Sequence, residues 1–247
     1  MNPLRKTIVT AFSLITFFLT GNAQNQLPTH QYFNKHNTYG FILHSDGWGV
    51  NFRKGYYGGG VRKIHGEFDL VSLKHPKEMK YFNPAYPDAK GYVFGKMNGL
   101  SVFRAGFGMQ DVLYTKARRA NGVEINYHFT GGFSCGLMKP VYLYIIYYTS
   151  SEAIIVEEKY DPTVHYPDNI FGRAPTTKGL SEIKFKPGIY LKSGMGFDYA
   201  AFSDEIRCLE TGFVLDYYFS EVPVMAMINN KSLYITFYLN FQIGSRK

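Results

Sequence analysis

The sequence has few cysteines and, beyond its first two dozen residues, no long apolar run. Only Cys135 and Cys208 occur among 247 residues, which is too few for a disulfide scaffold. No later segment reaches the length of about 20 apolar residues that a transmembrane helix needs. Tryptophan occurs once, whereas tyrosine and phenylalanine number 21 each and glycine 25. This composition argues against a helical membrane protein and suits a β-barrel, whose interface girdles are aromatic and whose crowded interior favours glycine.

Residues 1–23 have the pattern of a secretory signal. Arg5 and Lys6 precede an apolar stretch at 8–19 and a small-residue end at 21–23. We expect cleavage there, and no cysteine lies close enough to the cut for a lipid anchor. The remaining chain carries 25 basic and 19 acidic residues, a net charge of +6 spread along its length. We therefore expect no nucleic-acid partner after export, and the excess charge suits anionic lipid headgroups.

Residues 232–244 alternate without an error between apolar and uncharged polar or small side chains. Such a strand has one wholly apolar face. It fits either a soluble sandwich or a membrane barrel with its apolar side in lipid, and export favours the barrel. We interpret the apolar set as lipid-facing and as the insertion signal read by the assembly machinery. Its members are Leu233, Ile235, Phe237, Leu239, Phe241 and Ile243.

Eight segments show strand character. They are 39–53, 64–72, 92–116, 123–137, 141–148, 183–199, 208–217 and 232–244. A phase change near His44 in the first segment suggests a β-bulge. An even number of strands puts both chain ends on one side, as a barrel with periplasmic termini requires. We predict an all-β fold, an eight-stranded antiparallel transmembrane β-barrel over 39–247, preceded by a periplasmic tail over 24–38.

The predicted strands imply the side on which each connection lies. With periplasmic termini, the connections 54–60, 117–122, 150–179 and 221–230 are outside. Short turns near 138–140 and at 203–204 are periplasmic. The segment 74–91, with three prolines, is then a long connection on the periplasmic side.

The face opposite the lipid carries charges of both signs. An eight-stranded barrel is only wide enough to be filled by side chains or to hold one small ligand. We therefore predict a packed lumen with salt bridges, and the alternatives are a narrow channel or a ligand cavity. The predicted lumen charge network consists of Glu67, Asp69, Arg104, Glu124, Lys184, Lys186, Lys192, Glu210 and Asp216.

Three sets of residues carry groups with potential chemistry, but none has a diagnostic spacing. The longest connection holds oxygen and imidazole groups at Glu157, Glu158, Asp161, His165 and Asp168. These match no known metal-site spacing. Nucleophile and base types occur at Ser45 and Asp46 beside His44, and at Ser134 with His128. Because neighbouring strand positions face opposite sides, we expect no catalytic site, no metal, no cofactor and no enzymatic activity.

An almost purely apolar run lies between the last two predicted strands. Exposed apolar patches at a barrel rim mark a contact with protein or lipid, and methionine adapts to irregular surfaces. The other interpretation is that the run extends both strands into the headgroup region. The candidate partner-contact residues are Val222, Pro223, Val224, Met225, Met227 and Ile228.

Four stretches, 69–78, 122–132, 183–197 and the VPVMAM of 222–227, resemble small outer-membrane barrel proteins of Bacteroidota-type envelopes. The architecture is similar to the OmpA transmembrane domain and OmpX, although the connection at 74–91 departs from that pattern. The resemblance implies a barrel that is a structural or accessory subunit of a larger outer-membrane machine, for β-barrel assembly or type IX protein secretion. We expect a monomeric barrel in a bilayer that contains lipopolysaccharide, with at least one protein partner. The alternatives are a barrel enzyme acting on lipid or peptide and a narrow small-solute pore.

Overall fold

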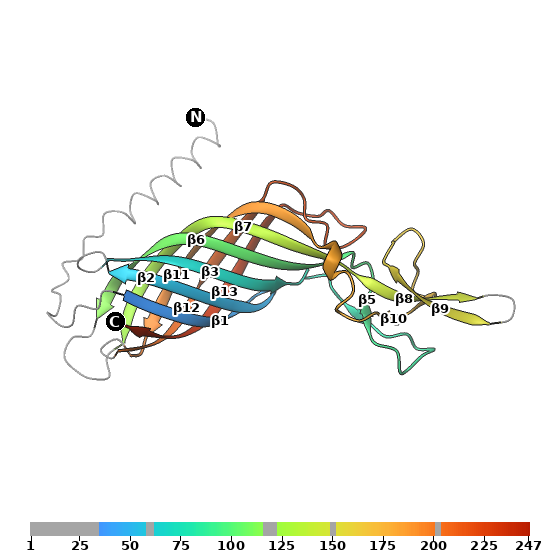
Figure 1. The fold of residues 1–247 in the computed structure, drawn as a ribbon, viewed down its shortest axis with the longest axis horizontal. Coiled ribbons are helices and arrows are strands. Elements are labelled where there is room, and N and C mark those ends of the chain that lie inside the picture. Colours follow the sequence, from blue (N-terminus) through green and yellow to red (C-terminus); the bar gives the residue numbers. More distant parts are fainter. Residues whose placement is uncertain (1–34, 58–61, 116–122, 149–151, 201–203) are drawn as a thin grey trace, which may run out of the picture. The chain divides into compact units, whose positions relative to one another are not determined.

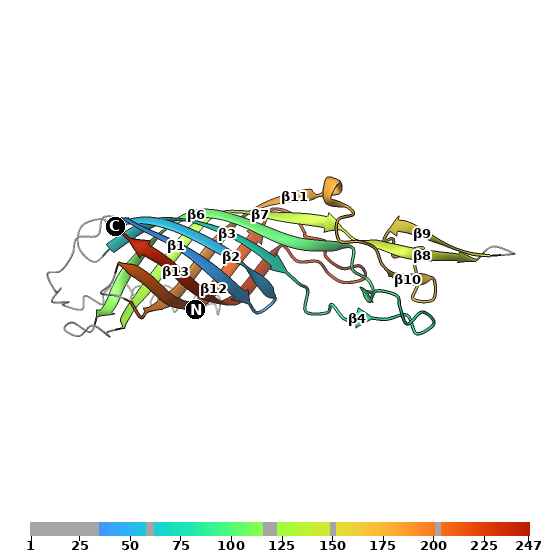
Figure 2. The same ribbon diagram turned by 60° about the horizontal axis from the view of Figure 1, so that its bottom comes forward.

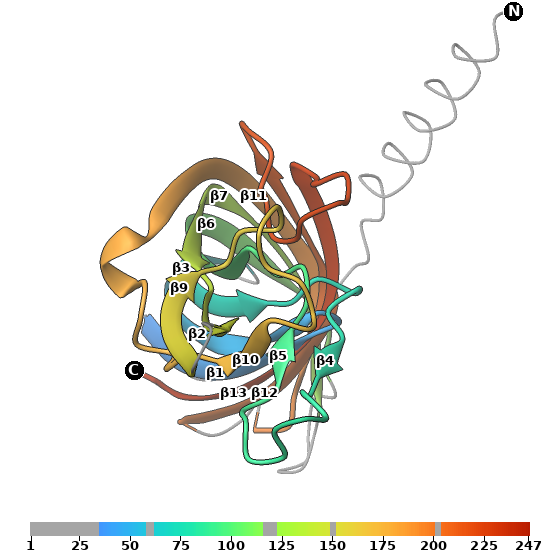
Figure 3. The same cartoon turned by 90° about the vertical axis from the view of Figure 1, so that its right-hand side faces the viewer.

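Eight antiparallel strands form a closed barrel in the computed structural model, which describes residues 35–57, 62–115, 123–148, 152–200 and 204–247. The order around the wall is β1-β13-β12-β11-β7-β6-β3-β2, and Figure 3 looks along this ring of strands. The wall strands are β1 (Lys35–His44), β2 (Gly47–Tyr57), β3 (Arg62–Leu73), β6 (Asn98–Thr115), β7 (Glu124–Pro140), β11 (Lys184–Asp198), β12 (Glu205–Tyr218) and β13 (Leu233–Arg246). The predicted fold class is confirmed. The predicted signal at 1–23 lies outside the described residues.

Side chains alternate between the lumen and the outer face along each wall strand. In β13 the polar residues Thr236, Asn240 and Gln242 are buried in the lumen, and the six alternating apolar residues point outward. Five of those six are between 42% and 68% exposed, and Leu239 is partly buried. The outer face of the barrel is therefore apolar, and the inner face is polar.

Two errors in the predicted strands compensate each other. The segment 39–53 is two strands, because β1 turns into β2 at Ser45-Asp46; the phase change is a hairpin turn and not a bulge. Gly47 is needed after this turn, since a Cβ there would lie 1.8 Å from the Ser72 carbonyl oxygen. β1 also begins at Lys35, inside the predicted tail. Conversely, 141–148 is not in the wall, because β7 pairs directly with β11.

The two ends of the barrel differ. At the terminal rim β1 begins, β13 ends, and the connections 58–61, 116–123 and 199–204 join the strands. At the distal rim lie the turn at 45–46 and the connections 74–97, 141–183 and 219–232. The expectation that 54–60 and 117–122 lie opposite the termini is therefore wrong, and 74–91 lies with the other long connections. No turn occurs at 138–140, because β7 runs on to Pro140.

The distal connections build a folded unit, which we call the distal cap (residues 74–97 and 141–183). It contains the pair β4 (Lys80–Tyr81) and β5 (Tyr92–Val93), and a sheet of β10 (Ile170–Arg173), β8 (Tyr142–Tyr148) and β9 (Ala153–Lys159), followed by the 3-10 turn η1 (Leu180–Glu182). Figures 1 and 2 show these strands beyond the distal rim. The cap has its own small core of Tyr92, Leu143, Ile145, Tyr160 and Ile170. No helix in the described part of the chain is long and apolar enough to cross a bilayer.

Candidate functional site

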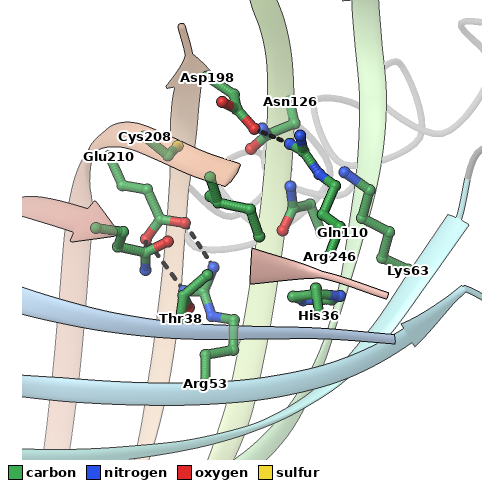
Figure 4. A pocket seen from close by; sticks show the side chains of 12 residues that line it. His36, Thr38, Arg53, Lys63, Gln110, Asn126, Asp198, Cys208, Glu210 and Arg246 are labelled. Carbon is green, nitrogen blue, oxygen red and sulfur yellow. Dashed lines mark hydrogen bonds and ion pairs between the residues drawn. The ribbon is translucent and has the colours of Figure 1, made fainter. Parts of the chain in front are cut away.

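The middle of the lumen is occupied by a cluster of paired charges. Arg53 on β2 lies between carboxylates of β3 and β12, and Figure 4 shows it beside the β12 carboxylate, Glu210. Its Nη2 is 2.7 Å from Glu67 Oε2, and its Nη1 is 2.5 Å from Glu210 Oε1. Both carboxylates and the guanidinium are at most 1% exposed. One buried cation thus joins three strands of the wall.

Two further cations extend the cluster across the lumen. Lys192 on β11 contacts Glu67 and places its Nζ 3.1 Å from Asp69 Oδ2. Arg104 on β6 donates to Asp216 through Nε at 2.9 Å and Nη2 at 2.7 Å. We call the resulting seven residues the lumen cluster: Arg53, Arg104, Lys192, Glu67, Asp69, Glu210 and Asp216. Three cations therefore face four carboxylates, and every member is at most 1% exposed.

Neutral polar side chains donate further hydrogen bonds to the carboxylate oxygens of the lumen cluster. Asn51 Nδ2 donates to Asp69 Oδ1 at 2.6 Å, and Gln242 Nε2 donates to Glu210 Oε2 at 3.0 Å. Ser134 Oγ donates to Asp216 Oδ1 at 2.9 Å. Buried charges are tolerated when they are paired and hydrogen-bonded in this way. The lumen cluster is a packed polar core.

The structure brings together six of the nine residues predicted for the lumen charge network. Glu124 instead pairs with Lys63 at 3.1 Å, near the terminal rim. Lys184 is exposed, and Lys186 donates to Ser220 Oγ at 2.9 Å, at the distal rim. Sequence reasoning missed Arg53, which donates four hydrogen bonds to Glu67 and Glu210. Its position two residues after inward-facing Asn51 was the available signal.

The distal mouth of the barrel is filled by the chain's own apolar run. Val222, Val224 and Met225 are at most 7% exposed and belong to the apolar core cluster that includes Val71 and Leu100 from the wall. We call residues 222–228 the plug. Its backbone is bonded to the cap connection, with Met97 N donating to Val224 O at 3.0 Å and Ala226 N to Gly95 O at 2.7 Å.

The plug changes the interpretation of the candidate partner-contact residues. Val222, Val224 and Met225 cannot contact a partner in this structure, because the barrel's own core buries them. Pro223 and Ile228 are partly buried. Met227 alone in the set is exposed, at 81%, and its φ of 59° marks the tip of the turn.

A small polar cavity lies in the lumen on the terminal side of the cluster. Its lining includes Thr38, Asn126, Cys208 and Arg246, as Figure 4 shows. The volume is about 20 Å³, which is room for a single water-sized molecule. Thr38 Oγ1 and Asn126 Oδ1 are buried without a protein partner, which suits an ordered water there.

The two cysteines lie on opposite sides of the wall. Cys135 shares the outward phase of Phe133, whereas Cys208 is 8% exposed and faces the lumen; both thiols are free. In detergent, a maleimide should therefore modify Cys135 and reach Cys208 only after the barrel unfolds. Mass spectrometry of the labelled peptides measures this. Rapid labelling of both thiols in the folded protein, or a disulfide between them, would contradict the assigned faces.

The other groups with potential chemistry are engaged in local contacts. His165 Nε2 lies 3.2 Å from Glu158 Oε2, and its Nδ1 accepts from Asp161 N at 3.0 Å. The hydroxyl and amide of Thr163 donate to the Asp161 carboxylate and lower its pKa. In the described ranges no three His, Cys, Asp or Glu side chains are grouped to hold a metal ion.

The two predicted nucleophile and base sets are also separated. Ser134 hydrogen-bonds Asp216, whereas His128 Nε2 lies 2.6 Å from the Tyr238 hydroxyl. Both ring nitrogens of His44 are buried without a hydrogen-bond partner. Neither arrangement places a serine against a histidine base.

Comparison with known proteins assigns no family to the chain. No protein-family model matches the chain, and no curated protein does. Among solved structures, neisserial surface protein A is 8% identical with a TM-score of 0.38, over 87% of this chain and 95% of that one. The attachment invasion locus protein Ail of Yersinia pestis is 6% identical with a TM-score of 0.39, over 87% and 100%.

A third similar structure is the N-terminal β-barrel domain of Pseudomonas aeruginosa OprF. It is 7% identical with a TM-score of 0.36, over 88% of this chain and all of that domain. The strand order of the chain itself defines its class. It is a closed eight-stranded antiparallel β-barrel, apolar outside and charged within.

Proposed function

We propose that the protein is an integral outer-membrane β-barrel, with periplasmic termini, that acts as a structural or accessory subunit of a larger membrane-protein complex. The observation that carries this proposal is a lumen closed by a charge cluster and a plug beneath a separately folded distal cap. A barrel built in this way serves as an anchor for the cap better than as a conduit for solutes.

The outer face supports the membrane location. Large apolar side chains from several wall strands are exposed, among them Trp48 at 55%, Phe107 at 80% and Phe213 at 61%. A soluble monomer rarely exposes a continuous apolar surface of this extent. A lipid-facing band on a polar-filled barrel is the arrangement of outer-membrane proteins, and the bilayer there includes lipopolysaccharide.

The rims support the orientation. Outer-membrane barrels have short periplasmic turns and longer external loops. Here the connections of the terminal rim are 58–61, 116–123 and 199–204, whereas 74–97, 141–183 and 219–232 are all distal. On this proposal the distal cap lies outside, where a partner in the outer membrane can reach it.

The choice of complex rests on the resemblance to barrels of Bacteroidota-type envelopes. It favours a machine for β-barrel assembly or type IX protein secretion, with the barrel as a non-enzymatic monomer. The test is purification of the tagged full-length chain from detergent-solubilised outer membranes, with photo-crosslinkers placed at Tyr148 in the cap and at Phe107 on the lipid face. We expect a protein adduct from Tyr148 and none from Phe107. A chain that migrates alone, with no adduct from the cap, would refute the role.

The filled lumen also predicts the result of an electrical measurement. Reconstituted in planar bilayers, the purified protein should show no steady ion conductance, because the lumen cluster and the plug occupy its cross-section. A variant in which Val222, Val224 and Met225 are all serine should remain closed, since the cluster is untouched. Reproducible single-channel steps in the unmodified protein would favour the small-solute pore.

A further inference from the structure

The outermost strand of the cap sheet has an unused edge. The sheet order is β10-β8-β9, so β9 pairs with β8 on one side. Among the described residues no strand pairs with its other side. An edge strand presents a row of free N–H and C=O groups, which is a template for another strand.

The first half of β9 lacks the features that usually protect such an edge, whereas its second half carries Glu157, Glu158 and Lys159. Ile154, Ile155 and Val156 are consecutive and 37% to 50% exposed, so apolar groups project from both faces. The neighbouring strand adds Tyr147 and Tyr148, at 40% and 72%. Residues 153–156 contain no lysine, no proline and no bulge, the usual means of blunting an edge. The apolar half of β9 is therefore open to pairing.

The cap segment that holds this edge is acidic, although the cap as a whole is not. Residues 141–183 carry six carboxylates and three basic residues, whereas the other cap segment, 74–97, carries two carboxylates and five lysines. Two of the carboxylates, Glu157 and Glu158, lie on β9 itself. Glu157 Oε2 is 3.3 Å from Lys178 Nζ, whereas its Oε1 is buried without a hydrogen-bond partner. The acidic end of β9 thus complements a basic strand.

We propose that β9 accepts an extended strand of a partner protein, which adds antiparallel to the free edge as a fourth strand of this sheet. The partner strand alternates apolar residues opposite 153–156 and carries basic residues next to Glu157 and Glu158. Such β-augmentation combines main-chain hydrogen bonds with side-chain selection. The inference rests on the proposed function and names the surface that the partner uses. A second copy fits less well, because antiparallel pairing of β9 with another β9 would set Glu157 and Glu158 against apolar residues of 153–156 and not against basic ones.

The first test measures binding of synthetic strands to the full-length protein in detergent micelles. The probe is a fluorescent peptide of about nine residues, long enough to span β9, with two lysines followed by alternating valine and threonine. A second peptide has glutamates in place of the lysines. Fluorescence anisotropy should show the lysine peptide binding about tenfold more tightly than the glutamate peptide at low salt. Equal binding, or no binding of the lysine peptide, would overturn the proposal.

Two single substitutions form a matched pair at the edge. Successive residues of a strand direct their N–H groups to opposite sides, so one of Ile155→Pro and Val156→Pro removes a free-edge donor and the other a donor to β8. The variant that removes the free-edge donor should bind the lysine peptide at least about tenfold more weakly, with the cap still resistant to limited proteolysis. Unchanged affinity in both variants would overturn the proposal.

A charge variant keeps the test valid even if both prolines disturb the cap. Replacing Glu157 and Glu158 together with glutamine should make the two peptides bind about equally. The affinity for the glutamate peptide should rise and the affinity for the lysine peptide should fall. Persistence of the tenfold preference would contradict the assigned edge. Sedimentation of the unmodified protein adds a further outcome, since a dimer that the edge proline dissociates would make a second copy the occupant and overturn the partner strand.

The peptide result and the copurification result are separable. If the protein copurifies with a complex and the edge variants still do so, the accessory role stands and the β9 surface is wrong. If it never copurifies, the accessory role fails whatever the peptides do.

Discussion

Replacing Arg53 with alanine should destabilise the barrel by about 3–5 kcal/mol, because it leaves two buried carboxylates without their cation. Arg53 is the shared partner of Glu67 and Glu210, and all three are at most 1% exposed. The remaining cation beside them, Lys192, already contacts Glu67 and Asp69. The cavity beside Arg53 measures about 20 Å³, so the only water that can reach the orphaned charges is the few molecules that it and the space of the lost side chain hold.

The measurement is urea unfolding of the protein in lipid vesicles, followed by the fluorescence of Trp48, the single tryptophan. The matched control is Arg62→Ala, which breaks an exposed ion pair with Asp111 whose side chains are 58% and 38% exposed. That loss should cost less than about 1 kcal/mol. Equal unfolding free energies for the two variants would refute the structural role of the lumen cluster.

A further variant distinguishes the loss of the ion pairs themselves from the cost of leaving buried carboxylates unpaired. Arg53→Met combined with Glu67→Gln and Glu210→Gln removes the cation and both carboxylates together. Replacing buried ions together with their partners by neutral groups is often close to neutral in stability, and here Lys192 keeps Asp69 and Arg104 keeps Asp216 as its carboxylate partner. We therefore expect this triple variant to recover much of the loss seen in Arg53→Ala.

Replacing Phe241 with lysine should cost about 2–4 kcal/mol, the penalty for a cation on the lipid face near the middle of the bilayer. Phe241 belongs to the apolar set on β13 and lies near the middle of the ladder that β13 forms with β1, and it is 51% exposed on the outer face. Its neighbours across the two ladders are Phe41 on β1 and Leu209 on β12. The substitution places the charge between two apolar strand positions.

The control for Phe241→Lys is Phe241→Leu, which keeps an apolar group and should cost less than about 1.5 kcal/mol. Folding into vesicles is read from the heat-dependent shift in gel mobility, and stability from urea titration. A Phe241→Lys protein that inserts fully and unfolds at the same urea concentration would contradict both the facing of β13 and the membrane location.

Alternation alone predicted the number and nature of the strands but not all of their neighbours. In 39–53, glycines at the turn disturb the alternation in the same way as a bulge does, so one strand was expected where two exist. In 141–148, every position is large and apolar or aromatic. In the wall strand β11 most inward positions are glycine or charged, as at Gly188, Lys192 and Gly194, with Tyr190 as an aromatic exception. The lack of glycine and charge in 141–148 was the available evidence against including β8.

The sequence predicts which side chains of a strand face the lumen, because this depends only on neighbouring positions of the same strand. A charged residue in phase with an inward glycine or asparagine lies in the lumen, which placed Glu67, Asp69 and Lys192 correctly. Which charges pair depends on the register between strands far apart in sequence, as with Arg53 and Glu210. The inward fold of the plug depends on its contact with the cap connection at Gly95 and Met97, which no local pattern encodes.

The pairing of β1 with β13 sets the order in which the wall can close. This ladder has nine residue pairs, the fewest of the eight in the described barrel, and joins His36 to Arg246, 210 positions later. Every other pair of adjacent wall strands is separated by a much shorter length of chain. Loop-closure entropy is therefore largest at this seam. Hairpins such as β6–β7 can form early, and the seam completes the cylinder last and is its weakest line against lateral opening.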